Sequence, residues 1–280
     1  MDSASWRLLN AAGPLPSQPL IARSVLAELS RGTAPELADL VEVDPSLSLA
    51  VLQAANAPHL RQARRVATVR QAMALLGTKA VESIATSRTA VLVMEPGDVG
   101  FPAGFWVQAI SVAASASVIA GCFGINPEEA FTGGILHGIG SLILYRSQPE
   151  IYRRVEQDAA RAGRSVSDHE RVVFGHSHAE IGALRLENWY LPERIVQAVR
   201  MHHAAPEALT NALSRALWAG VRFGTAIART VVSADSNEDL KPAAALRAVG
   251  LDGGLATQLI DDAENAVDLI LRTAGGRVNA

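Results

Sequence analysis

Repeated helix-start signals are the feature that most constrains the fold of this chain. Asp44 and Asn126 each precede a proline, so a side-chain capping acceptor stands directly before a residue suited to the first helical turn. Thr68 and Gln71 have the spacing of a capping box, and residues 33–36 repeat that spacing. No segment alternates apolar and polar residues convincingly, as a half-buried strand does. The chain is therefore predicted to be all-α.

The expected helices follow from these starts and from glycine and proline stops. Residues 163–167 and 233–238 are predicted loops. Helices are predicted from 45, from 68 to 77, from 78 to 94, from 127 through His137, from 192 to 203 and from 213 to 232, followed by two shorter ones from 240.

A stretch rich in glycine and proline, residues 95–102, is the best candidate for a domain boundary. A chain of 280 residues is too long for one small core and suits two units. We therefore expect an N-terminal helical subdomain at 1–98, packed on a helical bundle at 99–280.

Composition restricts the class of partner. The formal net charge is -3, so the chain gives no electrostatic reason to expect nucleic acid. The arginines between 61 and 70 are interpreted as a solvated face rather than a phosphate-binding patch. Cys122 is the single cysteine, so no intrachain disulfide can form, and its Ala and Val neighbours predict a small core residue.

One segment needs a membrane test, because residues 99–127 carry no charge and are long enough to span a bilayer. The segment contains Gln108, Ser111 and Ser115, and Ala and Ser dominate over Leu and Ile. Small residues of this kind let helices pack closely inside a protein. We interpret the segment as a buried helix and expect no contact with a membrane.

The most informative short motif is His137-Gly138, which lies inside an apolar run. Phosphohydrolases with a paired-metal site carry a His-Asp doublet in such a place, where the ring nitrogen and the carboxylate bind one metal centre. Gly138 has no side chain and cannot bind a metal. The motif therefore indicates a metal-enzyme scaffold that has lost part of its chemistry.

An ordered series of motifs resembles the HDOD family, the HD-related output domain of bacterial signalling proteins. The resemblance covers most of the chain, from about residue 14 to about residue 227, and rests on the order of the motifs rather than on any one of them. The series is DPSL at 44–47, LQAANA at 52–57, AMALLG at 72–77, FW at 105–106, AFTGGILHGIG at 130–140, Glu170 with Gly175, His178 and Gly182, WYLP at 189–192 and the His202-His203 pair.

The resemblance implies an all-α fold in which an N-terminal helical subdomain packs on a bundle related to HD-type metal phosphohydrolases. It also implies a cytoplasmic bacterial protein that serves as a regulatory module. Its expected partners are signalling proteins, including those of two-component or cyclic-di-GMP pathways, and an exposed apolar face could support a homodimer.

Carried onto this sequence, the family pattern of an HD-type site is incomplete. Gln108 stands where the first His would lie, Gly138 replaces the Asp of the doublet, and Ser141 replaces a Lys found in catalytic relatives. The final Asp would fall near Gly220, and no acid lies between residues 209 and 230. The residual candidate metal ligands are His137, His178, His202 and His203.

Three interpretations of these histidines remain open. They could bind a divalent metal weakly as neutral imidazoles, or pack the core as hydrogen-bonded remnants, or, for His202 and His203, simply contact the carbonyls at a helix end. We expect a non-catalytic regulatory module with no obligate cofactor. The alternative is a divergent metal-dependent phosphohydrolase with an altered ligand set, and a ligand-sensing pocket beside Gly138 and Gly220 is a third hypothesis. Glu170 and Glu180 could support metal ligands from behind, but they are expected to be solvated or to serve as cap partners.

Overall fold

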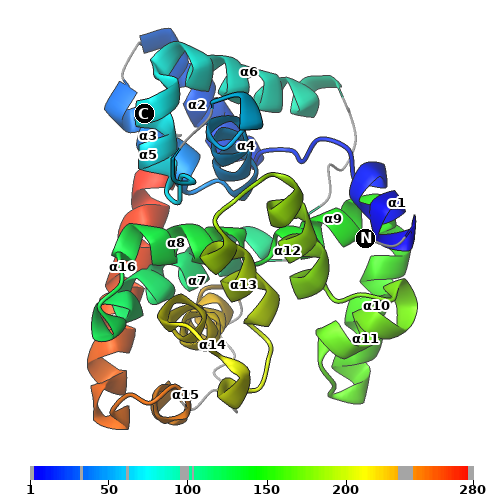
Figure 1. The fold of residues 1–280 in the computed structure, drawn as a ribbon, viewed down its shortest axis with the longest axis vertical. Helices are drawn as coiled ribbons and strands as arrows, with labels where there is room; N and C mark the ends of the chain where they lie inside the picture. The colour runs from blue at the N-terminus through cyan, green and yellow to red at the C-terminus, as the bar shows by residue number, and fades with distance from the viewer. Residues whose placement is uncertain are drawn as a thin grey trace.

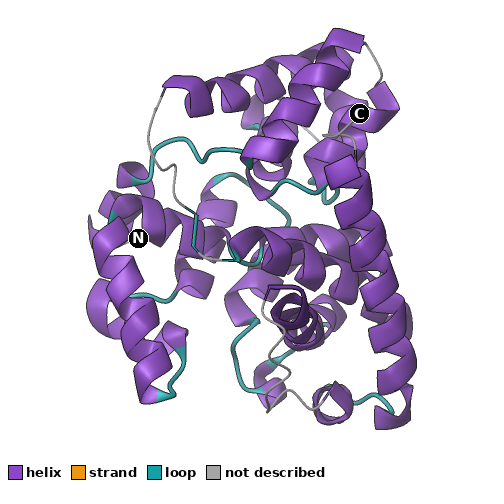
Figure 2. Cartoon of the chain, turned by 180° about the vertical axis from the view of Figure 1, so that it is seen from behind, coloured by secondary structure: helices purple, strands orange, loops and turns teal. Residues whose placement is uncertain are grey.

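The computed structural model describes residues 3–31, 34–60, 63–94, 101–102, 104–232 and 242–276. Every regular element in these ranges is helical, and Figure 2 shows helices joined by loops without a strand in the part of the chain it colours. The all-α prediction is confirmed.

Six helices precede the larger bundle, and helices α2 to α6 form the upper layer in Figure 1. They are α1 (Ser3–Ala11), α2 (Pro19–Arg31), α3 (Ala34–Glu42), α4 (Pro45–Ala55), α5 (Val69–Leu76) and α6 (Thr78–Met94).

The predicted capping residues begin their helices as expected. The Asp44 carboxylate accepts hydrogen bonds from the backbone N–H groups of Ser46 and Leu47, and Asn126 accepts one from the N–H of Glu128. Thr68 accepts one from the N–H of Gln71. These caps satisfy N–H groups that have no partner within their own helix, which is why the starts could be read locally. The expected cap at Thr33 lies outside the described residues.

The remaining helices form the larger bundle. They are α7 (Phe105–Ala120), α8 (Pro127–Leu136), α9 (Ile139–Ser147), α10 (Pro149–Ala162), α11 (Val166–Phe174), α12 (His178–Asn188), α13 (Glu193–Met201), α14 (Ala212–Val232), α15 (Pro242–Ala248) and α16 (Ala256–Gly276).

Helix α7 lies at the centre of this bundle, against α8, α14 and α16. Small residues allow the close approach: a Cβ built on Gly224 would lie 2.4 Å from the Val112 nitrogen, and one on Gly134 would lie 2.4 Å from the Ala113 Cα. The segment Phe105–Phe123 is the one described helix long and apolar enough to cross a membrane, but 61% of its most apolar window is buried inside the protein. This burial is typical of a core helix.

The two halves share one continuous hydrophobic core. Helix α1 packs against α9 and α12, and α16 reaches from α7 to α2, so the two ends of the chain both bridge the halves (Figure 1). The Arg65 guanidinium donates to the backbone carbonyl of Tyr190 and lies 5.0 Å from the centre of its ring, which joins the halves again. The expected boundary stretch at 95–100 lies outside the described residues, so the division at 98/99 stays a prediction.

Four expectations were wrong in detail. Cys122 is exposed rather than buried, because it lies in the turn after α7. The last helix, α16, has 21 residues and is not short. The helix that begins after Asn126 ends at Leu136, so His137 and Gly138 form a break before α9 instead of lying within a helix. Glu170 is fully buried and is not a solvated residue.

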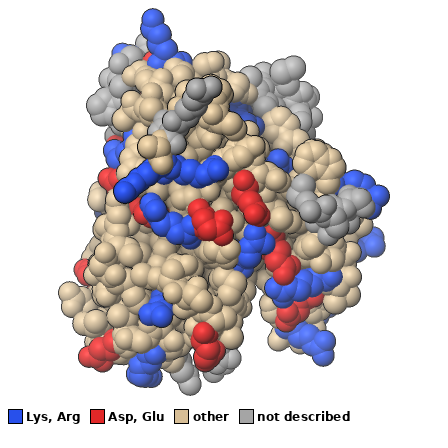
Figure 3. Space-filling model, in the orientation of Figure 1, with Lys and Arg blue, Asp and Glu red and all other residues tan. Residues whose placement is uncertain are grey.

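Charged side chains of both signs lie next to each other on the face seen in Figure 3. Arg70, for example, pairs with Asp39 at 2.9 Å and with Glu42 at 2.8 Å. The predicted solvated face therefore contains ion pairs within the chain, and the prediction of no nucleic-acid partner remains a prediction.

Candidate metal centre and pocket

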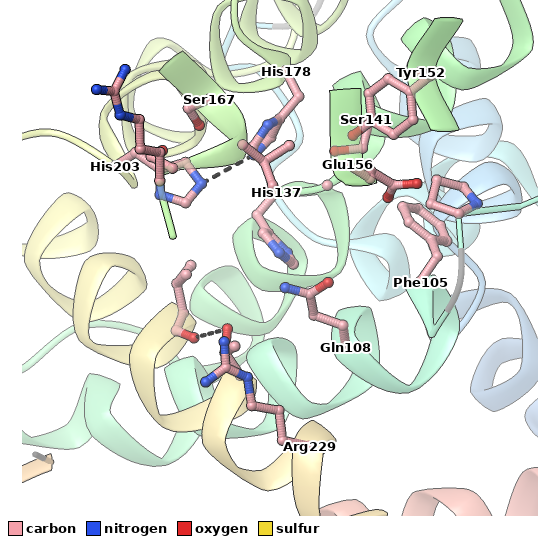
Figure 4. A pocket seen from close by; sticks show the side chains of 17 residues that line it. Phe105, Gln108, His137, Ser141, Tyr152, Glu156, Ser167, His178, His203 and Arg229 are labelled. Carbon is pink, nitrogen blue, oxygen red and sulfur yellow. Dashed lines mark hydrogen bonds between the residues drawn. The ribbon is translucent and has the colours of Figure 1, made fainter. Parts of the chain in front are cut away.

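A cavity of about 390 Å³ opens beside the break between α8 and α9 (Figure 4). Its volume falls within the range of small-molecule sites, about 300 to 1,000 Å³. The cavity brings together residues that are far apart in the sequence. Its lining includes Phe105, Gln108, His137, Gly138, Ser141, Tyr152, Glu156, Ser167, His178, His203, Val221, Thr225 and Arg229.

His178 is the most firmly oriented ligand candidate. It is the first residue of α12, which Ser177 and Glu180 begin with a complete capping box. The buried Glu170 carboxylate accepts from the His178 backbone N–H and from Nδ1, both at 2.7 Å. The Tyr152 hydroxyl donates to the other oxygen of Glu170 at 3.0 Å. With Nδ1 bound to a carboxylate, Nε2 is the His178 ring nitrogen left to bind a metal at the cavity.

His202 and His203 follow the last residue of α13. The Nδ1 atom of His202 lies 2.6 Å from the Val199 carbonyl oxygen, which fixes Nδ1 as the donor and leaves Nε2 as an acceptor. The expected contact between this pair and the carbonyls at the helix end is therefore present for His202. It does not compete with metal binding, since it uses the opposite ring nitrogen.

Together His178, His202 and His203 form the histidine cluster, whose ligand atoms all lie within 4.8 Å of one another. The His178 Nε2 atom lies 3.3 Å from His202 Nε2 and 3.1 Å from His203 Nε2. Two nitrogens bound to one tetrahedral zinc at about 2.0–2.1 Å would lie about 3.3 Å apart. The spacing therefore fits a shared metal ion.

The hydrogen bonds of the three histidines also favour a shared metal ion. His178 and His202 both bind an acceptor through Nδ1, so in their neutral forms the two Nε2 lone pairs face each other at 3.3 Å. His203 can supply at most one ring N–H toward this pair. A bound cation would meet all three Nε2 atoms at once.

His137 lies beside the histidine cluster but is not part of it. Its ring centre is 5.4 Å from that of His202, and its Nδ1 atom is 2.6 Å from the Gly134 carbonyl oxygen. Of the four predicted ligands, the structure thus gathers three and places the fourth at the adjacent wall. Whether any of them binds a metal stays a prediction.

Burial keeps the core imidazoles neutral. It lowers the pKa of His137 to about 4, and it holds the pKa of His202 well below its usual value, with a further decrease from His203 and His178. Burial alone would raise the pKa of Glu170, but its interactions with His178 lower it overall. The pocket region therefore combines the neutral imidazoles of His137 and His202 with an ionised carboxylate that binds His178 from behind.

Two of the three positions expected to supply further ligands line the same pocket, and neither has an acidic side chain. Gln108 and Gly138 both line it, in agreement with their predicted places. Gly220 does not, because it packs against Ala116 of α7, where a Cβ would lie 2.8 Å from that residue. The pocket side of α14 carries Val221 and Thr225 instead. The predicted register was therefore wrong for Gly220, although no carboxylate replaces the final Asp on this helix face.

Two carboxylates of the pocket region were not placed there from the sequence: Glu156 was not considered, and Glu170 was weighed as a support for a metal ligand but was expected to be solvated. Glu170 shares a buried face of α11 with Ser167 and Phe174, a helical spacing that could have revealed it. Glu156 lines the cavity from α10, and burial and the nearby Glu170 charge raise its pKa. Figure 4 places Glu156 beside Ser141 and Tyr152, away from His203.

Comparisons with known proteins agree with this architecture. The MmoQ response regulator of Methylococcus capsulatus str. Bath is 27% identical with a TM-score of 0.71, over 89% of this chain and 99% of that one. A protein of Shewanella amazonensis SB2B, provisionally named a phosphohydrolase, is 25% identical with a TM-score of 0.53, over 97% of this chain and 98% of that one.

An uncharacterized protein of Treponema pallidum (strain Nichols) is 24% identical over 177 residues, which is 62% of this chain and 34% of that protein. The chain thus spans about one third of the length of this relative. The HDOD domain model matches residues 15–205, well over half of the chain. On this match and the all-α fold, the chain belongs to the HDOD family.

Proposed function

We propose that this chain is a non-catalytic regulatory module of signal transduction that acts through contacts with partner proteins. The observation that carries the proposal is a ligand set built from imidazoles. His178, His202 and His203 converge, while Gly138 and the pocket side of α14 offer no carboxylate. Two-metal phosphoester hydrolysis relies on anionic ligands that partly neutralise and bridge hard dications. A three-imidazole set suits one borderline ion such as Zn²⁺ or Ni²⁺ instead.

In this role a metal would tie together segments that otherwise meet only by packing. His178 begins α12, while His202 and His203 follow α13. Glu170 connects the same ligand to α11. Binding energy at such a site adds to the stability of the arrangement it selects. Metal occupancy would therefore fix how α11, α12 and α13 sit relative to one another.

Helix α11 connects this centre to the surface. Its Ser167 and Glu170 are buried, whereas Val172 and Val173 on the same helix are 85% and 50% exposed. A shift of α11 caused by metal binding would move both faces together. The response regulator named among the similar structures supports a signalling role of this kind. We place the module in the bacterial cytoplasm with partners from two-component or cyclic-di-GMP pathways, on the family resemblance alone.

The test is a hydrolysis assay on metal-loaded protein with a chromogenic phosphodiester and with cyclic dinucleotides. We expect no turnover above buffer with Mn²⁺, Mg²⁺ or Zn²⁺, while amide hydrogen exchange in α11 slows when metal is added. Turnover that disappears in His178→Ala, but not in His59→Ala, would overturn the proposal. His59 is an exposed histidine outside the pocket and serves as the matched control.

A divergent metal-dependent phosphohydrolase is the second candidate function. The specific observation in its favour is the carboxylate behind His178, because a Glu170–His178 pair is the arrangement that orients metal-bound histidines in metalloenzymes. The neighbour provisionally named a phosphohydrolase is consistent with it. Glu156 is the one carboxylate that lines the cavity, so loss of turnover in Glu156→Gln would favour this function.

A further inference from the structure

The N-terminus of α11 opens onto the cavity wall next to the histidine cluster. Ser165, Val166 and Ser167 all line the cavity. The Ser165 side chain is in the capping position but makes no capping hydrogen bond. The first N–H groups of a helix have no partner within the helix and carry its partial positive charge. Such a terminus can bind an anion when other groups support it.

The second observation is the hydroxyl of Ser167. The residue is 3% exposed, and its oxygen has no hydrogen-bond partner within the described part of the chain. Figure 4 shows this hydroxyl directed toward the space between His178 and His203. Buried hydroxyls nearly always have a partner, and leaving one unpaired costs stability. A buried hydroxyl without a partner on a cavity wall indicates that an atom of a bound ligand would accept its hydrogen bond.

The charges around the cavity favour an anion at this corner. Arg164 directly precedes the helix terminus and lines the cavity, and no ion pair holds its guanidinium among the described residues. Arg229 adds a second positive charge from α14. Asp168 lies in the first turn of α11, but its carboxylate pairs with Arg171. Glu156 is the opposing charge that lines the cavity.

We propose that the α11 terminus, with Ser167 and Arg164, binds the phosphate group of a small molecule. The geometry supplies what a phosphate requires: backbone donors at a helix start, a hydroxyl donor and a guanidinium. The cavity, at about 390 Å³, is larger than a phosphate ion needs. Phe105 and Val221 provide apolar lining for the rest of a molecule of nucleotide size.

The proposed phosphate site can be tested independently of metal binding. The histidine cluster lies at the start of α12 and directly after α13, whereas the proposed phosphate site uses α11 and the two residues before it. Binding is therefore measured on metal-free protein in EDTA, where failure of the phosphate site and failure of the proposed function give different results.

The experiment titrates inorganic phosphate and AMP into the full chain by phosphorus NMR and calorimetry. We expect saturable binding of both, and Arg164→Ala and Ser167→Ala should each weaken it about tenfold, as for loss of a hydrogen bond to a charged group. Arg161→Ala is the matched control, because Arg161 is 75% exposed, pairs with Asp158 and does not line the cavity. Tighter binding of AMP identifies a nucleotide-like source, and equal binding identifies free phosphate.

Two further results distinguish a binding role from a structural one. Ser167→Ala should leave the thermal midpoint unchanged or raised, because it removes an unpaired buried hydroxyl. Glu156→Gln should tighten phosphate binding several-fold by removing the opposing charge. Absence of binding up to about 10 mM, a limit that still detects weak millimolar sites, would overturn the proposal. So would binding that Arg164→Ala, Ser167→Ala and Arg161→Ala leave equal.

Discussion

Two buried polar centres, one in each half of the molecule, differ in whether the chain itself satisfies them. Around Asp44, the Ser17 hydroxyl and the backbone N–H groups of Gln18, Ser46 and Leu47 all donate to the carboxylate. At the histidine cluster, the Nε2 atoms face one another with at most one ring N–H to share. A complete centre holds a fold together, whereas an incomplete one indicates an external ligand.

This comparison predicts its largest effect at Asp44. Asp44→Ala would leave several buried donors without an acceptor and remove the cap of α4, so we expect a loss of about 3 to 5 kcal/mol in the free energy of unfolding. Urea denaturation measures it. Asp39→Ala, an exposed partner of Arg70 in the same layer, should cost less than about 1 kcal/mol. A small effect of Asp44→Ala would mean that its hydrogen bonds are not maintained in solution.

The histidine cluster should behave in the opposite way. Zinc at about one hundred times its dissociation constant should add about 2.7 kcal/mol to the free energy of unfolding. His178→Ala should remove this increment and should also destabilise the metal-free protein, because it takes a donor away from the buried Glu170 carboxylate, while His59→Ala should keep the increment. Thermal unfolding with and without EDTA measures the increment from zinc and the stability of the metal-free protein. Stabilisation of His178→Ala by zinc to the same extent as the wild type would show that the cluster does not bind the metal.

The packing of α9 against α12 at Gly140 connects the stability of the fold with metal binding. A Cβ on this residue would lie 1.9 Å from the His178 carbonyl oxygen and 2.7 Å from the Gly182 nitrogen, so α9 and α12 would have to separate. We expect Gly140→Ala to cost about 1 to 3 kcal/mol and also to weaken metal binding. Gly133→Ala on α8 is the matched control, since its Cβ would make only an ordinary 3.8 Å contact with Leu217. Equal behaviour of the two variants would contradict this packing.

The smallest effects concern pH, where Asp44 and His137, which lies beside the histidine cluster, change the stability in opposite directions. Burial lowers the pKa of His137 to about 4 in the folded protein, below its unfolded value. The unfolded chain then binds more protons between about pH 6.5 and 4, so stability falls as pH decreases, by about 1 kcal/mol from pH 7 to 5.5. Burial raises the pKa of Asp44 to about 6, above its unfolded value, so the folded protein takes up a proton here first. Over the same decrease in pH this group therefore increases the stability, by slightly less than about 1 kcal/mol.

Variants separate these two contributions. In EDTA, His137→Gln should make the acid loss of stability shallower, because the substituted side chain cannot take up a proton. Asp44→Asn should make it steeper, because the compensating gain is removed. Denaturation at pH 7 and 5.5 measures the slopes. Changes of slope in the reverse directions would show that the buried charges are assigned to the wrong groups.

Local signals predicted the fold well. Capping by Asp44 and Asn126 depends on residues two or three positions away, so the sequence contains the whole interaction. The exposure of Cys122 and the facing of Gly220 toward α7 depend instead on how helices pack, and both were missed. The candidate site was predicted in part: the histidines were named, but only the tertiary contact between α12 and α13 brings residues 178 and 202 together.

Glu170 shows the same limit of prediction from sequence. Its face on α11 was readable from the spacing to Phe174, yet its partner is on the next helix and no local pattern connects them. A glutamate between Arg and His residues therefore looked solvated. Packing makes it the residue that orients His178, and sequence alone gives no register between α11 and α12.

The most direct test of the incomplete-centre account is an elemental analysis of protein purified without chelators and then dialysed against limiting zinc. We predict about one zinc per chain in the wild type and in His59→Ala, with loss of zinc in His178→Ala and in His202→Ala. Wild-type protein that retains no zinc under these conditions, or a His178→Ala variant that retains as much as the wild type, would contradict the account.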